Sequence, residues 1–408
     1  MKMTTCHDGG NLTADQVKEF GLAWTDLLHT DFSGSRSTSQ FVGIVISEDK
    51  NVLLSVPKFF RERKGLKDAQ LLLRVFESYK AHDTPNFTGN LDVIKTNIPL
   101  EDFETILNYY LQNGLYRKPK RTITSKGTGK INWKRTLQSE IPIFSNGNLI
   151  FKDLCRSQTQ LMNNVVTLAM QYVLMNNQDL LRLLQVELKF SDCVGAPSTS
   201  VELERELSLR LHQELQETYV DKDRHLIHAL VGFLNHHSAV GPKYIVTTTF
   251  DIIWEKIVLD YLNHNYAGLD KCRVVFSPHA PTYNFEYQKV FVIDFSQNGK
   301  PKWQIRPDYY MRFNDQQLIF DAKYYVNLDN LNYKQLVYGL LLGEGKRAVG
   351  LNTVNMLFAP TDGKTRSGEH ISLLPEFAPT DRQVRIDIRW LNMNEMLNQF
   401  VSVTRWQN

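Results

Sequence analysis

Two contrasting patterns of apolar residues mark the N-terminal third of the chain. Residues 40–60 (QFVGIVISEDKNVLLSVPKFF) hold two apolar runs on either side of the polar stretch Ser47–Asn51, which predicts two β-strands joined by a turn. Apolar residues recur at helical spacing over 66–82 and over 101–112, which predicts two helices. We therefore expect a mixed α/β region over about residues 1–140.

The middle of the chain has helical spacing almost throughout, and a Gly-Ala-Pro-Ser break at 195–198 divides it. Three segments show this spacing: Phe151–Met175, Asp179–Phe190 and Val201–Leu234. The sequence therefore predicts a helical lead-in to whatever follows Gly241-Pro242, a pair of residues that indicates a boundary.

Beyond this boundary the spacing alternates between that of strands and that of helices. Strands are expected near Lys243–Thr247, Val290–Asp294, Trp303–Phe313, Gln317–Tyr325 and Asn355–Pro360. Helices are expected near Phe250–Asn263 and Leu328–Leu342. We predict that residues 141–408 comprise the helical lead-in and one α/β domain.

Composition narrows the class of protein. A chain of 408 residues with 42% hydrophobic content is globular and long enough for two or three domains, and its net charge of +3 does not itself indicate a nucleic-acid partner. The four cysteines are far apart, unlike those of a zinc ribbon or a secreted disulfide framework. There is no apolar run long enough for a signal peptide or a membrane span, so we expect a cytoplasmic protein.

Charge is concentrated in the segment 117–135 (RKPKRTITSKGTGKINWKR), which has eight Lys or Arg residues and no acid. Three interpretations stay open: DNA binding, docking of a partner protein, and a solvated surface with no ligand. The candidate contact residues are Lys126, Lys130, Trp133, Lys134 and Arg135, with the Trp133 ring available to stack on a base.

Part of this segment, Gly127-Thr128-Gly129-Lys130, resembles the end of a phosphate-binding Walker A loop. Thr124 stands where that motif needs its first Gly, and Ile131 stands where it needs Ser or Thr. We therefore expect no nucleotide hydrolysis by this chain.

The chemistry is predicted to lie in Trp303–Tyr325 (WQIRPDYYMRFNDQQLIFDAKYY). A hairpin turn at Asn314-Asp315 makes residues face each other when their numbers add up to 629, which pairs Asp308 with Asp321 on one face of the sheet. Lys323 shares that face because it lies two residues beyond Asp321.

Two opposed carboxylates destabilise a sheet unless a cation lies between them. Mg²⁺ accepts such oxygen ligands, so we expect Asp308 and Asp321 to bind it, together with the backbone carbonyl of Ala322. The ion would polarise a phosphate and help to generate hydroxide from water. Lys323 would assist the nucleophile or offset transition-state charge.

Pro307-Asp308 followed by Asp321-Ala322-Lys323 resembles the PD-(D/E)xK motif of restriction-endonuclease-like nucleases. This resemblance implies an α/β sandwich and an acid on a preceding helix. Glu255 fits that position, and its helical spacing with Ile252 and Leu259 puts it on the apolar, sheet-packing side. Two interpretations of Glu255 stay open: a further acid of the site, or one partner of a salt bridge with a nearby Lys or Arg.

The motif's family also has a following helix with a polar residue and a tyrosine, for which Gln335 and Tyr338 are the candidates. They are three residues apart where the related pattern has four, so Lys334 is an alternative for the polar position. The segment could equally be an amphipathic helix in which Tyr338 only packs against its neighbours.

The whole chain is similar to the LlaJI-type restriction endonuclease family of McrC-like nuclease subunits. The residues that carry this resemblance are Phe41–Phe59, Gly127–Thr136 and the segment around the PD-(D/E)xK motif. It implies a Mg²⁺-dependent subunit that cleaves double-stranded DNA together with a separate AAA+ GTPase motor. In that case the N-terminal region would dock the motor.

Two other functions stay open. The chain could be a stand-alone DNA repair or recombination nuclease, in which case Mg²⁺ alone would support cleavage. It could instead be a non-catalytic adaptor of an AAA+ GTPase, in which case restriction would survive loss of Asp321.

Overall fold

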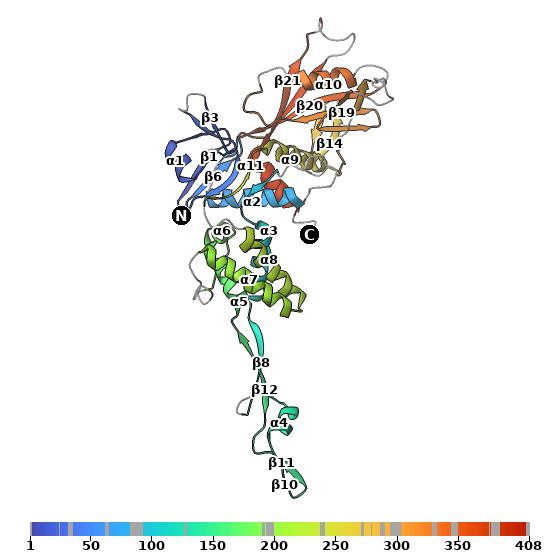
Figure 1. The fold of residues 1–408 in the computed structure, drawn as a ribbon. Coiled ribbons are helices and arrows are strands. Elements are labelled where there is room, and N and C mark those ends of the chain that lie inside the picture. The colour runs from blue at the N-terminus through green and yellow to red at the C-terminus, as the bar shows by residue number, and fades with distance from the viewer. Residues whose placement is uncertain are drawn as a thin grey trace. The chain divides into compact units, whose positions relative to one another are not determined.

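The computed structural model describes residues 2–23, 25–31, 36–61, 65–81, 93–125, 129–189, 192, 200–236, 241–270, 273–278, 280–285, 290–293, 303–328, 333–343, 350–374, 376 and 384–404. The chain forms two compact units (Figure 1). The larger one comprises Met1–Lys95 and Gly241–Asn408, and the smaller one comprises Thr96–Val240. The smaller unit is therefore inserted into the larger one. Its limits differ from the division expected near residue 140, and the second segment of the larger unit begins at Gly241, where Gly241-Pro242 indicated a boundary.

One five-stranded sheet of the larger unit has the strand order β1-β6-β5-β13-β7. Its strands are β1 (Met3–His7), β6 (Val52–Val56), β5 (Val42–Ile46), β13 (Lys243–Thr247) and β7 (Lys95–Thr96). The predicted strands around Ser47–Asn51 are confirmed, and both are buried along their whole length. The strand predicted at Lys243–Thr247 exists but does not belong to the α/β domain that follows it, because it pairs antiparallel with β5.

Smaller elements and a helix cover this first sheet. Three short strands, β2 (Asn11–Leu12), β3 (Leu28–Thr30) and β4 (Ser37–Ser39), accompany the helix α1 (Ala14–Glu19). Their apolar side chains form one core with Phe41, Val45, Leu53 and Val246 of the sheet. The predicted helix over 66–82 is α2 (Leu66–Ala81).

The second five-stranded sheet has the order β18-β19-β20-β22-β21. Its strands are β18 (Tyr309–Phe313), β19 (Gln316–Ala322), β20 (Asn352–Thr361), β22 (Arg385–Asn392) and β21 (Arg366–Ser372). The pairs β19–β20 and β20–β22 are parallel, and the two outer pairs are antiparallel. The helices α9 (Phe250–Asn265), α10 (Tyr333–Gly343) and α11 (Met393–Thr404) accompany it. The strands β21 and β22 and the helix α11 were not predicted.

Two short hairpins complete the larger unit: β14 (Tyr266–Asp270) with β15 (Arg273–Phe276), and β16 (Val290–Ile293) with β17 (Trp303–Ile305). The single strand predicted over Trp303–Phe313 is in fact two, β17 and β18. The break falls at Arg306–Asp308, where Pro307 has no N–H to donate to a ladder.

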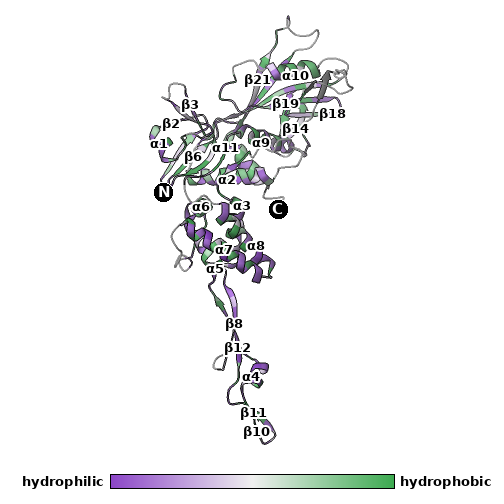
Figure 2. Ribbon diagram, in the orientation of Figure 1, coloured by the Kyte–Doolittle hydropathy of each residue, from purple (hydrophilic) through white to green (hydrophobic). Residues whose placement is uncertain are grey.

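Among the described residues of 96–240, helices form the body of the smaller unit. They are α3 (Leu100–Asn113), α5 (Val165–Asn176), α6 (Gln178–Leu183), α7 (Val201–Glu217) and α8 (Asp221–His236). Hydrophilic colour covers much of α7 and α8 in Figure 2, as expected for helices with one solvated face. Within the described ranges, no helix is both long and apolar enough to cross a membrane.

An arm extends from these helices as a long β-ribbon (Figure 1). We define the arm as the described residues of 118–162. Its elements are β8 (Lys118–Thr124), β9 (Lys130–Ile131), α4 (Trp133–Ser139), β10 (Ile143–Ser145), β11 (Asn148–Ile150) and β12 (Arg156–Met162). The helix predicted over Phe151–Met175 is therefore wrong in its first half. Residues 156–162 pair with β8, and the helix begins only after Asn164, whose side chain caps it.

Candidate functional site

The site begins with a hairpin whose register follows from its turn. Asn314 has φ 51, a left-handed conformation that Asn tolerates better than most residues. Strand pairs run from Phe313 with Gln316 to Tyr309 with Phe320. The numbers in each pair add up to 629, so the predicted register is confirmed. Asp308 precedes the first residue of β18 and lies next to the end of β19.

The hairpin brings Asp308, Asp321 and Lys323 together, and we call these three residues the carboxylate site. Asp321 is fully buried, and Asp308 and Lys323 are 8% and 9% exposed. The backbone N–H of Ala322 donates to Asp308 Oδ2 over 2.9 Å. The Lys323 ammonium forms an ion pair with Asp321. The geometric expectation for these residues is met: they converge in one place.

Burial of like charges alters the acidity of this site. The pKa of Asp308 is raised to about 8, first by burial and then by the negative charges of Asp321 and Glu255, while Lys323 acts in the opposite direction. An acid with such a pKa is largely protonated at neutral pH unless a cation stabilises its carboxylate. Electrostatic strain of this kind is concentrated at functional sites.

Helix α10 adds a second cation. The side chain of Lys334 is 55% exposed, and its Nζ lies 3.8 Å from Asp321 Oδ1 and 5.5 Å from the ring centroid of Tyr338. Burial lowers the pKa of Lys334, but the charges of Asp321 and Asp308 outweigh burial and raise it overall. Lys334, considered from the sequence as an alternative to Gln335, is therefore the residue of this pair that reaches the carboxylate site.

Gln335 is turned into the protein interior. Its Nε2 donates to the carbonyl of Ile319 over 3.1 Å and to Asn355 Oδ1 over 2.5 Å, and Asn355 Nδ2 donates back to the carbonyl of Gln335. The Tyr338 hydroxyl donates to the carbonyl of Arg306 over 3.0 Å. These contacts hold α10 against β19, β20 and the segment before β18.

Glu255 lies in α9 and is half-buried. The fully buried face of this helix contains Ile253, Trp254 and Ile257, so the predicted packing face through Ile252 and Leu259 is displaced by about one residue. The Tyr309 hydroxyl donates to the backbone carbonyl of Glu255. Glu255 thus lies at the edge of the buried face, and its negative charge contributes to the raised pKa of Asp308.

The donor set of the carboxylate site suits a hard cation. It comprises two carboxylates and, at the same end of β19, the backbone of Ala322. Burial raises the pKa of Asp308 most, and repulsion from Asp321 and Glu255 raises it further. A divalent ion would relieve that repulsion. Over the described part of the chain, no group of three or more His, Cys, Asp or Glu residues is placed to hold a metal.

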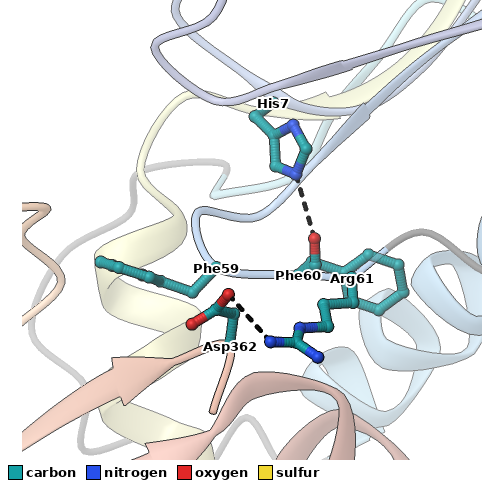
Figure 3. A pocket seen from close by; sticks show the side chains of 5 residues that line it. All are labelled: His7, Phe59, Phe60, Arg61 and Asp362. Carbon is teal, nitrogen blue, oxygen red and sulfur yellow. Dashed lines mark hydrogen bonds and ion pairs between the residues drawn. The ribbon is translucent and has the colours of Figure 1, made fainter.

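An open pocket lies elsewhere in the larger unit (Figure 3). Its lining residues are His7, Phe59, Phe60, Arg61 and Asp362. His7 Nε2 lies 3.0 Å from the carbonyl of Phe60, and Arg61 pairs with Asp362 at 3.3 Å. None of the predicted site residues lines this pocket.

The basic segment 117–135 lies largely in the arm. Lys130, Trp133, Lys134 and Arg135 are exposed, while Lys126 lies outside the described residues. Trp133 also packs edge-on against Phe151, with ring centroids 6.0 Å apart. The basic side chains are thus available to a ligand, but so is a second class of residue on the same elements.

That second class is apolar, and the sequence analysis missed it. Several large apolar side chains of the arm are exposed, reaching 89% at Ile141 and 75% at Phe144. The β10–β11 hairpin turns at Asn146-Gly147, where both residues have positive φ. An Asn-Gly pair between alternating apolar residues is a strong hairpin signal, so this element could have been found from the sequence.

Comparison with known proteins assigns the family. A model of the LlaJI restriction endonuclease family matches residues 41–337, most of the chain. This chain belongs to the LlaJI restriction endonuclease family. The match includes the carboxylate site, Glu255 and Lys334, and it ends before Tyr338. Membership of a restriction endonuclease family implies nuclease activity.

The component YdjA of the type II restriction enzyme BsuMI from Bacillus subtilis (strain 168) is 24% identical over 402 residues, which cover 88% of this chain and 78% of YdjA. Two solved assemblies of Thermococcus gammatolerans are also similar. One, McrB AAA+ hexamers with bound McrC, has a TM-score of 0.37 at 11% identity over 98% of this chain and 99% of the other. The other, the McrBC complex, has a TM-score of 0.27 at 12% identity over 64% and 88%.

Proposed function

We propose that this LlaJI-family chain is the nuclease subunit of a GTP-dependent restriction system and hydrolyses phosphodiester bonds of double-stranded DNA with Mg²⁺. The observation that carries the proposal is the joint burial of Asp308, Asp321 and Lys323 at the end of one hairpin, with the pKa of Asp308 raised to about 8. Such an arrangement is unfavourable for stability by itself and becomes favourable with a divalent cation. The sheet β18–β22 with its helices would then be a restriction-endonuclease-like sandwich.

In this proposal Asp308, Asp321 and the carbonyl of Ala322 hold Mg²⁺. When bound, Mg²⁺ supplies a Lewis acid for the phosphate and lowers the pKa of a water molecule. The Ala322 N–H fixes the orientation of Asp308 through its 2.9 Å bond to Oδ2. Lys323, beside Asp321, would donate hydrogen bonds from its ammonium to negative charge that develops on the phosphate oxygens.

Lys334 has a different part in this proposal. Its side chain is more than half exposed, so it can turn from Asp321 toward an incoming phosphate, while Lys323 still pairs with Asp321. We assign it to neutralising the DNA backbone beside the scissile bond. Glu255 contributes charge that keeps the pKa of Asp308 high until the cation binds.

A single set of variants tests the assignment. Asp308→Ala and Lys323→Ala, each in the full chain with its partner, should lower the cleavage rate by about 1,000-fold or more. Asp315→Asn is the matched control, because Asp315 is an exposed acid in the turn of the same hairpin. Cleavage at the normal rate by both alanine variants would remove the proposed role of the carboxylate site.

We further propose that the arm docks a partner subunit, an AAA+ GTPase motor that delivers DNA. Exposed apolar residues interleaved with basic ones favour a protein surface over a phosphate backbone, which offers no apolar contact. The relative from Bacillus subtilis is itself named a component of an enzyme, which supports a multi-chain system. The test is to co-express the chain with its neighbouring reading frames and identify what co-purifies. Efficient DNA cleavage by the purified chain with Mg²⁺ alone would instead support a stand-alone nuclease.

A further inference from the structure

The strand that carries the carboxylate site ends in a buried tyrosine. β19 ends at Ala322, but the N–H of Lys323 still donates to the carbonyl of Phe358 over 2.8 Å, so the chain follows its neighbour for one more residue. Tyr324 is buried, whereas Tyr325 is 58% exposed. Tyr324 is therefore the last anchored residue before the chain leaves the sheet.

The anchor comes from the first sheet of the same unit, far away in sequence. The backbone N–H of Lys58 donates to the Tyr324 hydroxyl over 2.8 Å, and the Lys58 ammonium lies 4.8 Å from the centroid of the Tyr324 ring. On another side the ring of Phe250, the first residue of α9, packs at 5.2 Å between centroids. Tyr324 is thus held at its hydroxyl by the Lys58 N–H and at its ring by the Phe250 ring and the Lys58 ammonium.

Lys58 is itself held in place. Its ammonium lies 3.6 Å from Asp8 Oδ2, and the N–H of Asp8 donates to the carbonyl of Val56 over 2.9 Å. Asp8 directly follows β1, and Lys58 follows β6, its parallel partner in the first sheet. Burial raises the pKa of Asp8, against the opposing influence of Lys58 and the Tyr324 hydroxyl. The residues that contact Tyr324 are therefore fixed by the paired ends of β1 and β6.

We propose that Tyr324 is a positioning residue for the nuclease centre, which ties the end of β19 bearing Asp321 and Lys323 to Lys58 and Asp8 of the first sheet. This inference rests on the proposed function. Lys323 can place its ammonium beside Asp321 only if its own backbone is fixed, and it lies between the ladder bond to Phe358 and the anchored Tyr324. Displacements of about 1 Å in a catalytic group are costly to rate.

The substitution Tyr324→Phe separates positioning from packing, because it retains the ring and removes only the hydroxyl that accepts from Lys58. Tyr325→Phe is the matched control, since it makes the same change at the adjacent exposed tyrosine. Both variants are assayed as full chains with the partner subunit. We expect Tyr324→Phe to lower kcat about 10-fold with the DNA KM unchanged, and Tyr325→Phe to match the parent.

The folded fraction of each variant, followed by circular dichroism, is used to express kcat per folded molecule. An unchanged kcat per folded molecule for Tyr324→Phe would overturn the inference, and so would an equal loss in Tyr325→Phe. Asp321→Ala is measured in parallel. If Asp321→Ala is inactive while Tyr324→Phe is fully active, only the positioning role fails. If Asp321→Ala cleaves normally, the proposed function fails and this inference with it.

Discussion

The carboxylate site buries charge, whereas the arm exposes apolar surface. Asp321 has no exposed surface, yet it is an acid with a second acid beside it. Ile141 and Phe144 are large apolar residues, yet most of their surface faces solvent. Both arrangements lower the folding stability of the chain without its ligands, because proteins normally bury apolar groups and solvate charges.

The comparison teaches that each region is suited to something outside this chain. A divalent cation would relieve the repulsion at the carboxylate site, and an apolar protein surface would cover the arm. The two expected ligands differ in character because one region buries charge and the other exposes apolar surface. If this is so, each region should depend on its own ligand.

Metal removal should have the largest effect. Chelation of divalent ions should abolish DNA cleavage by the complete system, and Mg²⁺ should raise the melting temperature of the metal-free chain. The Asp321→Asn variant should show neither metal-dependent cleavage nor a higher melting temperature with Mg²⁺. The substitution removes a buried charged ligand but keeps the shape of the side chain. Calorimetric titration with Mg²⁺ alone measures the binding. Undiminished binding by Asp321→Asn would place the metal elsewhere.

Asp308→Asn should stabilise the metal-free chain. The folded-state pKa of about 8 is above the ordinary value of 3.8, so the folded chain holds a proton that the unfolded chain has lost between these values. The stability of the parent chain therefore falls as pH rises from about 4 to about 8. The advantage of the variant should grow by about 3–4 kcal/mol between pH 5 and pH 8, measured by urea unfolding. A constant difference across that range would contradict the raised pKa.

The arm should lose its partner when its exposed apolar residues become polar. The double variant Ile141→Ser and Phe144→Ser should weaken binding of the partner subunit about 10- to 100-fold, with the chain still folded. Lys130→Glu with Lys134→Glu serves as the comparison on the same arm. If the charge reversals instead remove a salt-dependent affinity for DNA, and the serine variant binds the partner normally, the arm is a DNA-binding element.

Two adjacent residues of α10 should behave differently, and this is the smallest expected effect. Lys334→Gln should lower cleavage about 10-fold with only a small loss of stability, because Lys334 lies beside Asp321 but is more than half exposed. Gln335→Ala should cost about 1–3 kcal/mol of stability, because it leaves buried partners on Ile319 and Asn355 unsatisfied. Both are read from cleavage per folded molecule and urea midpoints. Equal effects of Lys334→Gln and Gln335→Ala on cleavage per folded molecule would contradict the different roles of these two residues.

Local pattern determined much of this protein. The turn at Asn314-Asp315 and the alternation of the two flanking strands were enough to predict the register, and with it the convergence of Asp308, Asp321 and Lys323. The strands around Ser47–Asn51 and several helices followed from periodicity alone. Such features are set by neighbours within about a dozen residues, and the sequence displays these neighbours directly.

Tertiary structure decided what depends on distant contacts. The strand Lys243–Thr247 has the same apolar character whether it joins the first sheet or the second, and only pairing with β5 places it. Residues 156–162 carry a pattern compatible with a helix, but β8 draws them into a ribbon. The choice between Lys334 and Gln335 depends on how α10 rotates as it packs on β19. In each case the free energy comes from contacts between segments far apart in the chain, which no local window contains.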